Sequence, residues 1–151
     1  MTTRVFDLME EEIRNIVSQR AAFEEKYGKH AGAMLVHAPS LFRLFVRVTF
    51  DLELPSHARH LAGATAVYVS EPQDFLGRLG VEGYIDDLWL SYAALSRLVE
   101  AVGEQKLLKH WRSEHALSDV VSLALNVNVL EEVVPSRVLT LMQSYIGGAA
   151  S

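Results

Sequence analysis

The chain has 151 residues, of which 50% are hydrophobic and 22% are charged, and its formal net charge is −5 at pH 7. This length is typical of one globular domain, so we expect residues 1–151 to form a single unit with its own core. The absence of cysteine excludes thiol nucleophiles, zinc knuckles and iron–sulfur clusters. The acidic charge balance argues against nucleic acid as a partner, because binding to phosphates depends on clustered cations.

Acidic side chains occupy the N-terminal segment, at Asp7 and at positions 10–12, where a signal peptide would need an apolar stretch. The longest uncharged runs, 120–130 and 138–151, are shorter than the roughly 20 apolar residues of a membrane-spanning helix. We therefore expect a cytoplasmic protein.

Apolar residues at steps of three and four predict a long amphipathic helix over 6–27. Gly28 follows it, and glycine can adopt the left-handed conformation that ends a helix. Residues 29–38 are interpreted as a loop or a broken turn, because Gly32 interrupts their short apolar patch.

Prolines mark the starts of the next two helices. Proline fits the first turn of a helix, so we expect one helix from Pro39 to about Asp51 and another from Pro55 to about Ser70. The second of these helices carries small residues that would let another helix approach closely: Ala58, Ala62, Gly63, Ala64 and Ala66.

The segment 71–83 is rich in glycine and proline and is interpreted as a surface loop. The most regular helical pattern follows over 85–102, with Trp89 and Tyr92 on its inner stripe and Gly103 as its terminator. This segment is the central helix of the predicted fold.

Three further helices are expected in the last third of the chain. They are a short basic helix over 104–112, a helix over 117–132, and a last helix from Pro135 to the glycines at 147 and 148. Asparagine and valine alternate at 126–129, a pattern that is also typical of a strand, but no second strand is available to pair with it. The fold class is therefore all-α, a compact bundle of about six to seven helices.

Two adjacent carboxylates, Asp86 and Asp87, begin the central helix, and Asp74 precedes them in the loop. Their position in a first helical turn favours capping of free backbone N–H groups, or an inward ion pair with a residue such as Arg59. Carboxylates gathered by a loop could alternatively bind a divalent cation or perform acid–base chemistry.

Two other groups are weaker candidates. His57 and His60, three residues apart on a helix, could ligate a metal, although the simpler interpretation places His57 in the core and His60 in solvent. A basic cluster could contact anionic lipid headgroups or an acidic partner, and it consists of Lys106, Lys109, His110 and Arg112 with Trp111.

The central helix is preceded and begun by the motif Gly83, Tyr84, Ile85, Asp86 and Asp87, within the stretch 39–98. This stretch resembles the YkvA-like family, a bacterial domain of unknown function, whose motif Gly-Tyr-Leu-Asp-Asp differs from it by one conservative change. The preceding stretch 71–76 departs from the family pattern, because its Pro and Asp are displaced and a second Pro is missing. The resemblance implies a small helical domain with acidic residues at a turn and no accepted substrate.

We expect a non-enzymatic helical protein that binds a protein partner or a membrane surface, with no catalytic residue and no cofactor, because amphipathic helices are abundant and catalytic motifs are absent. The alternative is a metal-dependent, hydrolase-like enzyme that uses a divalent cation held by Asp74, Asp86 and Asp87. The identity of the partner stays open, and self-association into a homo-oligomer is one alternative.

Overall fold

The computed structural model describes residues 7, 10, 11, 13–15, 17–70, 84–132, 134 and 136–150. Every regular element in these ranges is a helix, which confirms the all-α prediction. The labelled elements are α2 (Arg20–Tyr27), α3 (Lys29–Leu35), α4 (Ala38–Thr49), α5 (Ser56–Ser70), α6 (Tyr84–Val102), α7 (Glu104–Leu108), α8 (Leu117–Ala124), α9 (Asn128–Glu131) and α10 (Ser136–Ala150). These helices outnumber the expected six to seven because the helix predicted over 117–132 is broken into α8 and α9, and because α3 was not predicted.

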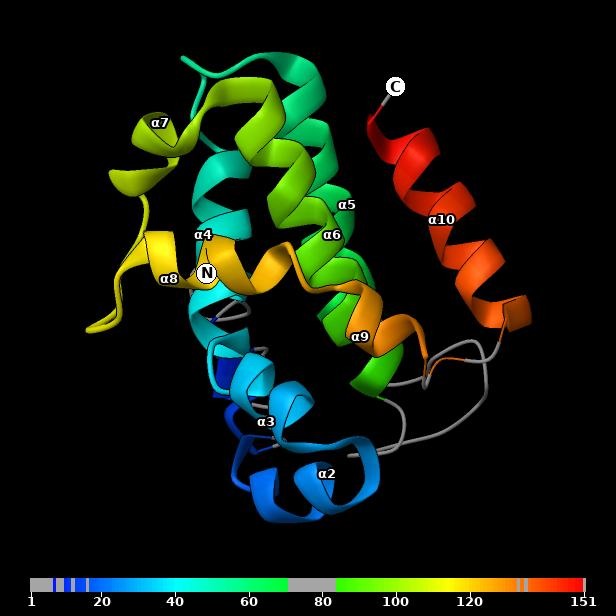
Figure 1. Ribbon diagram of the computed structural model, residues 1–151. Helices are drawn as coiled ribbons and strands as arrows, with labels where there is room; N and C mark the ends of the chain where they lie inside the picture. The colour runs from blue at the N-terminus through cyan, green and yellow to red at the C-terminus, as the bar shows by residue number, and fades with distance from the viewer. Residues whose placement is uncertain are drawn as a thin grey trace.

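Helices α4, α5 and α6 lie side by side and form the centre of the fold (Figure 1). Helix α10 packs on α5 and α6, while α8 and α9 cross α6 on another side. The pair α2 and α3 packs together beyond one end of the three central helices. The core therefore follows α4, α5 and α6, each of which contacts at least two other helices.

Helix α4 has its proline in the first turn, as the sequence predicts. Its apolar stripe is buried at Leu41, Leu44, Phe45 and Val48. On the outer side Arg43 forms ion pairs with Asp7 and Glu10, which tie the N-terminal helical residues to α4.

Helix α6 matches its prediction from start to end. The side chains of Ile85, Leu88, Trp89, Tyr92 and Leu95 are all buried, in agreement with the apolar stripe. Its C-terminal glycine has φ 86°, the left-handed conformation that only glycine adopts without strain. The indole Nε1 of the tryptophan donates to Oε1 of Glu131 at 3.2 Å, which links α6 to α9.

The N-terminal prediction is partly wrong. A turn at Ser18 and Gln19 separates α2 from the helical residues before it, and the Oγ of Ser18 donates to the carbonyl of Asn15. A side chain that binds a nearby carbonyl competes with the helical backbone, which favours a break. Gly28, with φ 99°, ends α2 as expected.

The interpretation of 29–38 as a loop is wrong, because Lys29–Leu35 forms α3. Gly32 lies inside this helix, where an added Cβ would overlap the side chain of Glu24 on α2. The glycine therefore allows two helices to approach closely, and the buried Met34 and Leu35 outweigh its low helix propensity.

Several boundaries in the last third of the chain also differ. The basic helix ends at Leu108, and the helix expected over 117–132 is interrupted by a turn at 125–127. Helix α10 continues through Gly147 and Gly148, where no positive φ occurs, because the buried Ile146 anchors its last turns. Leu141, expected in the core, is 48% exposed.

Among the described residues, no single helix combines the length and apolar composition needed to cross a membrane. Helices α3 and α4 meet those criteria only as a pair, with a bend of 43° between them. The loop expected over 71–83 lies outside the described residues.

Candidate functional site

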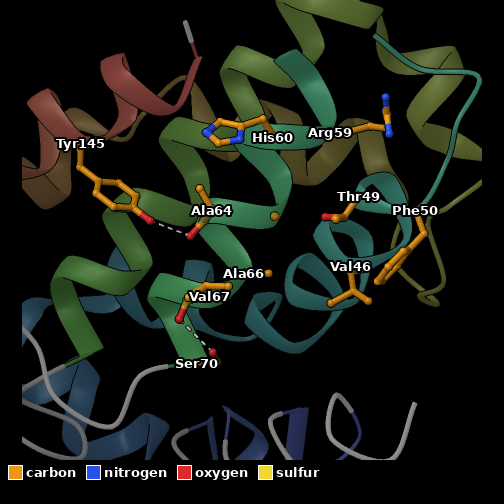
Figure 2. A pocket seen from close by; sticks show the side chains of 11 residues that line it. Val46, Thr49, Phe50, Arg59, His60, Ala64, Ala66, Val67, Ser70 and Tyr145 are labelled. Carbon is orange, nitrogen blue, oxygen red and sulfur yellow. Dashed lines mark hydrogen bonds between the residues drawn. The ribbon is translucent and has the colours of Figure 1, made fainter. Parts of the chain in front are cut away.

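An apolar groove of about 450 Å³ is bordered by α4, α5 and α10 (Figure 2). Val46 and Phe50 come from the end of α4, Val67 comes from α5, and Tyr145 reaches the groove from α10. Phe50 is 62% exposed and Val67 is 60% exposed, although both are large apolar residues. The volume lies in the range of pockets that accept small molecules or anchoring side chains.

The small residues of α5 explain why the groove forms. An added Cβ at Gly63 would lie 3.2 Å from Cγ2 of Thr49, so α4 and α5 approach closely at this glycine. Ala66, one turn further along α5, lies beneath the surface with 6% exposure and gives the groove a shallow floor. Larger side chains at these positions would fill the hollow between the two helices.

Helix α10 forms one side of the groove and is held in place by contacts of Tyr145. The hydroxyl of Tyr145 donates to the carbonyl oxygen of Ala64 at 2.8 Å, and its ring packs against that of Tyr68 with centroids 5.1 Å apart. Partial burial raises the pKa of the Tyr145 phenol above its ordinary value, so the group stays a neutral donor. These contacts hold α10 against α5 along the groove.

Polar groups at the groove mostly turn toward their own backbone. The hydroxyl of Thr49 donates to the carbonyl of Phe45 at 2.7 Å, and that of Ser70 donates to the carbonyl of Val67 at 2.9 Å. Arg59 lies at the opposite end from Ser70, where its Nε donates to the carbonyl of Leu54 at 3.2 Å. The groove is therefore apolar in its middle and cationic at one end.

The carboxylates expected at the start of α6 occupy its first turn and are both buried. The hydroxyl of Tyr68 donates to Oδ2 of Asp86 at 3.0 Å, which links α5 to α6. The hydroxyl of Ser91 donates to the carbonyl of Asp87, a bond within α6. Arg59, the partner suggested from the sequence, instead donates to the backbone of Leu54.

The metal alternative requires a third ligand. The described part of the chain contains no group of three His, Asp or Glu side chains that could hold a metal ion. Asp74 lies outside the described residues, as does Gly83 of the family-like motif, so their arrangement around Asp86 and Asp87 is not described.

Both histidines of α5 are exposed, so the expectation that His57 faces the core is wrong. The buried face of α5 begins one residue later, at Ala58, and continues through Leu61 and Thr65. With Ala58 rather than His57 in the core, no imidazole has to be removed from water. This orientation of α5 is therefore the more favourable one. His60 is exposed, as expected, and lies beside the groove.

The basic cluster is largely engaged within the protein. Nζ of Lys109 lies 3.0 Å from Oδ2 of Asp51 and 3.2 Å from Oε2 of Glu53, while Nε2 of His110 lies 2.7 Å from Oδ2 of Asp51. The hydrogen bonds from His110 and then Lys109 hold the pKa of the Asp51 carboxyl well below its usual range. Trp111 is buried and donates from Nε1 to the carbonyl of His115 at 2.7 Å.

Comparison with protein-family models, with curated proteins and with solved structures finds no match for this chain.

Sequence reasoning did not identify the groove, because its residues belong to helices whose other faces form the core. One signal was available. Val67 lies off the inner stripe of α5, and the small residues of α5 indicate a close helix approach. Only the packing shows that this approach leaves an open hollow rather than a filled contact.

Proposed function

We propose that this protein is a non-enzymatic helical module that binds an apolar segment of a partner protein in the groove between α4 and α5. The observation that carries the proposal is the groove itself, with Phe50 and Val67 exposed at its edge. Exposed apolar surface that gathers at a depression, rather than lying scattered, is typical of binding sites. Covering it removes apolar area from water, which stabilises a complex by roughly 25 cal/mol per Å².

The charge distribution favours a protein partner over a membrane surface. Stable peripheral binding needs an apolar insertion together with a cluster of cations that meets anionic headgroups. Lys109 and His110 of the basic cluster are engaged with Asp51, and the chain as a whole carries a net charge of −5. An apolar groove with one cationic end suits a segment of protein better than an anionic lipid surface.

A metal-dependent, hydrolase-like activity is the second proposal, and the burial of two consecutive acidic residues, Asp86 and Asp87, favours it. Carboxylate oxygens are preferred ligands of divalent cations. Their place in the first turn of α6 offers the competing explanation of helix capping. The proposed kinship with the YkvA-like family rests on the same pair and on the residues just before it.

A displayed library of random helical peptides tests the interaction proposal, because it presents many different apolar segments to the groove at once. Peptides selected on the purified protein should bind with Kd values in the micromolar range or below, measured by fluorescence polarisation. Val67→Glu should weaken that binding at least tenfold, since it places a charge at the edge of the groove.

The matched control is Leu125→Glu, which makes the same chemical change at a residue that is 77% exposed and lies outside the groove. It should leave peptide binding unchanged. Equal losses from the two substitutions, or a selection that yields no binder, would contradict the proposal.

A further inference from the structure

The groove carries one formal charge, and it is positive. Arg59 is the charged residue among the described groove residues, and no carboxylate accompanies it there. Within the part of the chain that the structure describes, its guanidinium is held through Nε by the Leu54 carbonyl and forms no ion pair.

The orientation of Arg59 is set without using its full donor capacity. A guanidinium has five N–H donors, and a single bond from Nε leaves the planar fork of terminal amino groups available. That fork is suited to bidentate binding of a carboxylate. Because the side chain is half-buried beside an apolar groove, an ion pair there would be screened less than one in open solvent.

The groove follows α5 in a regular stripe. Its residues on this helix recur at steps of three and four, from Arg59 through Gly63 and Val67 to Ser70. The eleven helical steps from Arg59 to Ser70 extend over about 16 Å, which equals about three turns of a second helix lying alongside. Helical ligands bind such grooves through residues on one face, at i, i+3, i+4 and i+7.

The distance between Arg59 and Val67 sets how far apart an acidic residue and an apolar residue must lie on a partner helix. Arg59 and Val67 are eight residues apart on α5, so their Cα atoms are separated by about 12 Å along the helix axis. A partner helix would cover that distance with residues seven or eight positions apart. A carboxylate at one end of this interval meets Arg59, while an aliphatic or aromatic side chain at the other end meets Val67 and Phe50.

We infer that the occupant of the groove is an amphipathic helical segment of another protein, with an acidic residue seven or eight positions from an apolar anchor. The inference rests on the proposed function and specifies the chemistry of the partner. Charge complementarity at one end of the groove supports it, because the described groove residues include the cationic Arg59 and no carboxylate.

The test uses the peptides selected from the helical library together with their own variants. Selected sequences should contain Asp or Glu seven or eight residues from a large apolar residue. Replacing that acid by its amide in a synthetic peptide should weaken binding to the unaltered protein at least fivefold. This change leaves the protein intact, so a folding defect cannot explain the result.

Substitutions at Arg59 provide the second arm. Arg59→Glu should weaken binding at least tenfold, and a peptide with lysine in place of the acid should regain affinity for that variant. The matched control is Arg137→Glu, the same charge reversal at an exposed position of α10 outside the groove. The control should bind the original peptide as the unaltered protein does, and thermal melts should show both variants folded.

The outcomes separate the two proposals. If Val67→Glu abolishes peptide binding while Arg59→Glu and the amide peptide have no effect, the acidic partner is excluded and the apolar groove stands. If Val67→Glu has no effect, the groove is not the binding site and both proposals fail. Binding to vesicles of phosphatidylglycerol that is lost in Arg59→Glu would assign the groove to lipid and overturn the inference.

Discussion

The hydroxyl of Tyr92 donates a 2.7 Å hydrogen bond to the carbonyl oxygen of Met34, a residue 58 positions earlier in the chain. Both side chains are fully buried, and burial raises the pKa of the Tyr92 phenol well above its usual range. The bond joins the middle of α6 to the end of α3. The bond therefore fixes the position of α3, the helix that the sequence pattern alone did not predict.

Tyr92→Phe should destabilise the protein by about 1 to 3 kcal/mol, because the Met34 carbonyl would lose this hydrogen bond inside the core. Urea unfolding followed by circular dichroism measures the change. The control is Tyr145→Phe, which removes a similar bond to the carbonyl of Ala64 from a half-buried side chain. A loss at Tyr145 as large as that at Tyr92 would contradict the explanation from burial.

Trp89→Ala should cost about 3 to 5 kcal/mol, the usual range for deleting a large buried aromatic side chain. The indole is 4% exposed and contacts both the core and Glu131. Arg97→Ala, on the exposed side of the same helix, should change the free energy of unfolding by less than about 0.5 kcal/mol. If the two substitutions lowered the free energy of unfolding by similar amounts, the face of α6 that carries Trp89 would contribute no more to stability than the exposed face.

The contrast between α6 and α3 shows what determines predictability. Helix α6 packs against neighbours along most of its length, so its apolar residues recur at helical spacing, and Gly103 ends it. Helix α3 has seven residues and contains Gly32, so its own sequence favours it weakly. It forms because tertiary contacts bury Met34 and Leu35, and periodicity does not report such contacts.

The candidate site was less predictable than the fold. Residue type and helical position placed Asp86 and Asp87 in a first turn, as the structure has them. The groove depends on how far α4 and α5 stay apart on one side of Gly63, which is a property of two helices together. Exposed apolar residues such as Val67 also occur singly on many surfaces, so its place off the inner stripe of α5 does not by itself indicate a groove.

Acidification should destabilise the junction between α3 and α4 through His37. Burial, followed by the charges of His115 and Arg20, lowers the pKa of His37 below its ordinary value of 6.5, while Asp119 opposes this shift. The unfolded chain therefore binds the proton more readily than the folded protein. The stability contribution of the neutral imidazole is present above about pH 6.5 and is lost as the pH falls below it.

The measurement is the free energy of unfolding between pH 5 and pH 7. In His37→Gln, which cannot titrate, the decline in stability on acidification should be smaller than in the unaltered protein. His60→Gln removes an exposed histidine and should leave the pH dependence unchanged. An unchanged slope in His37→Gln would show that the ring contact between His37 and His115, with centroids 4.9 Å apart, does not resist protonation.

The last prediction distinguishes helix capping from metal binding at the start of α6. If Asp86 and Asp87 cap the helix, Asp→Asn keeps an acceptor oxygen for the Tyr68 hydroxyl but removes a charge that favours the helix N-terminus. Each substitution should then cost on the order of 1 kcal/mol, with the larger loss at the fully buried Asp86. Added Mg²⁺, Mn²⁺ or chelator should not change the melting temperature.

A metal site gives a different pattern in the same measurements. A cation that binds only the folded state stabilises it in proportion to the logarithm of its concentration above Kd, so the melting temperature of the unaltered protein would rise with added metal. Asp86→Asn or Asp87→Asn would abolish that rise because each removes an anionic ligand. We expect no such rise, since both carboxylates lie in the first turn of α6, where the helix dipole favours them. A reproducible shift that disappears in Asp86→Asn would favour the enzyme proposal over the interaction module.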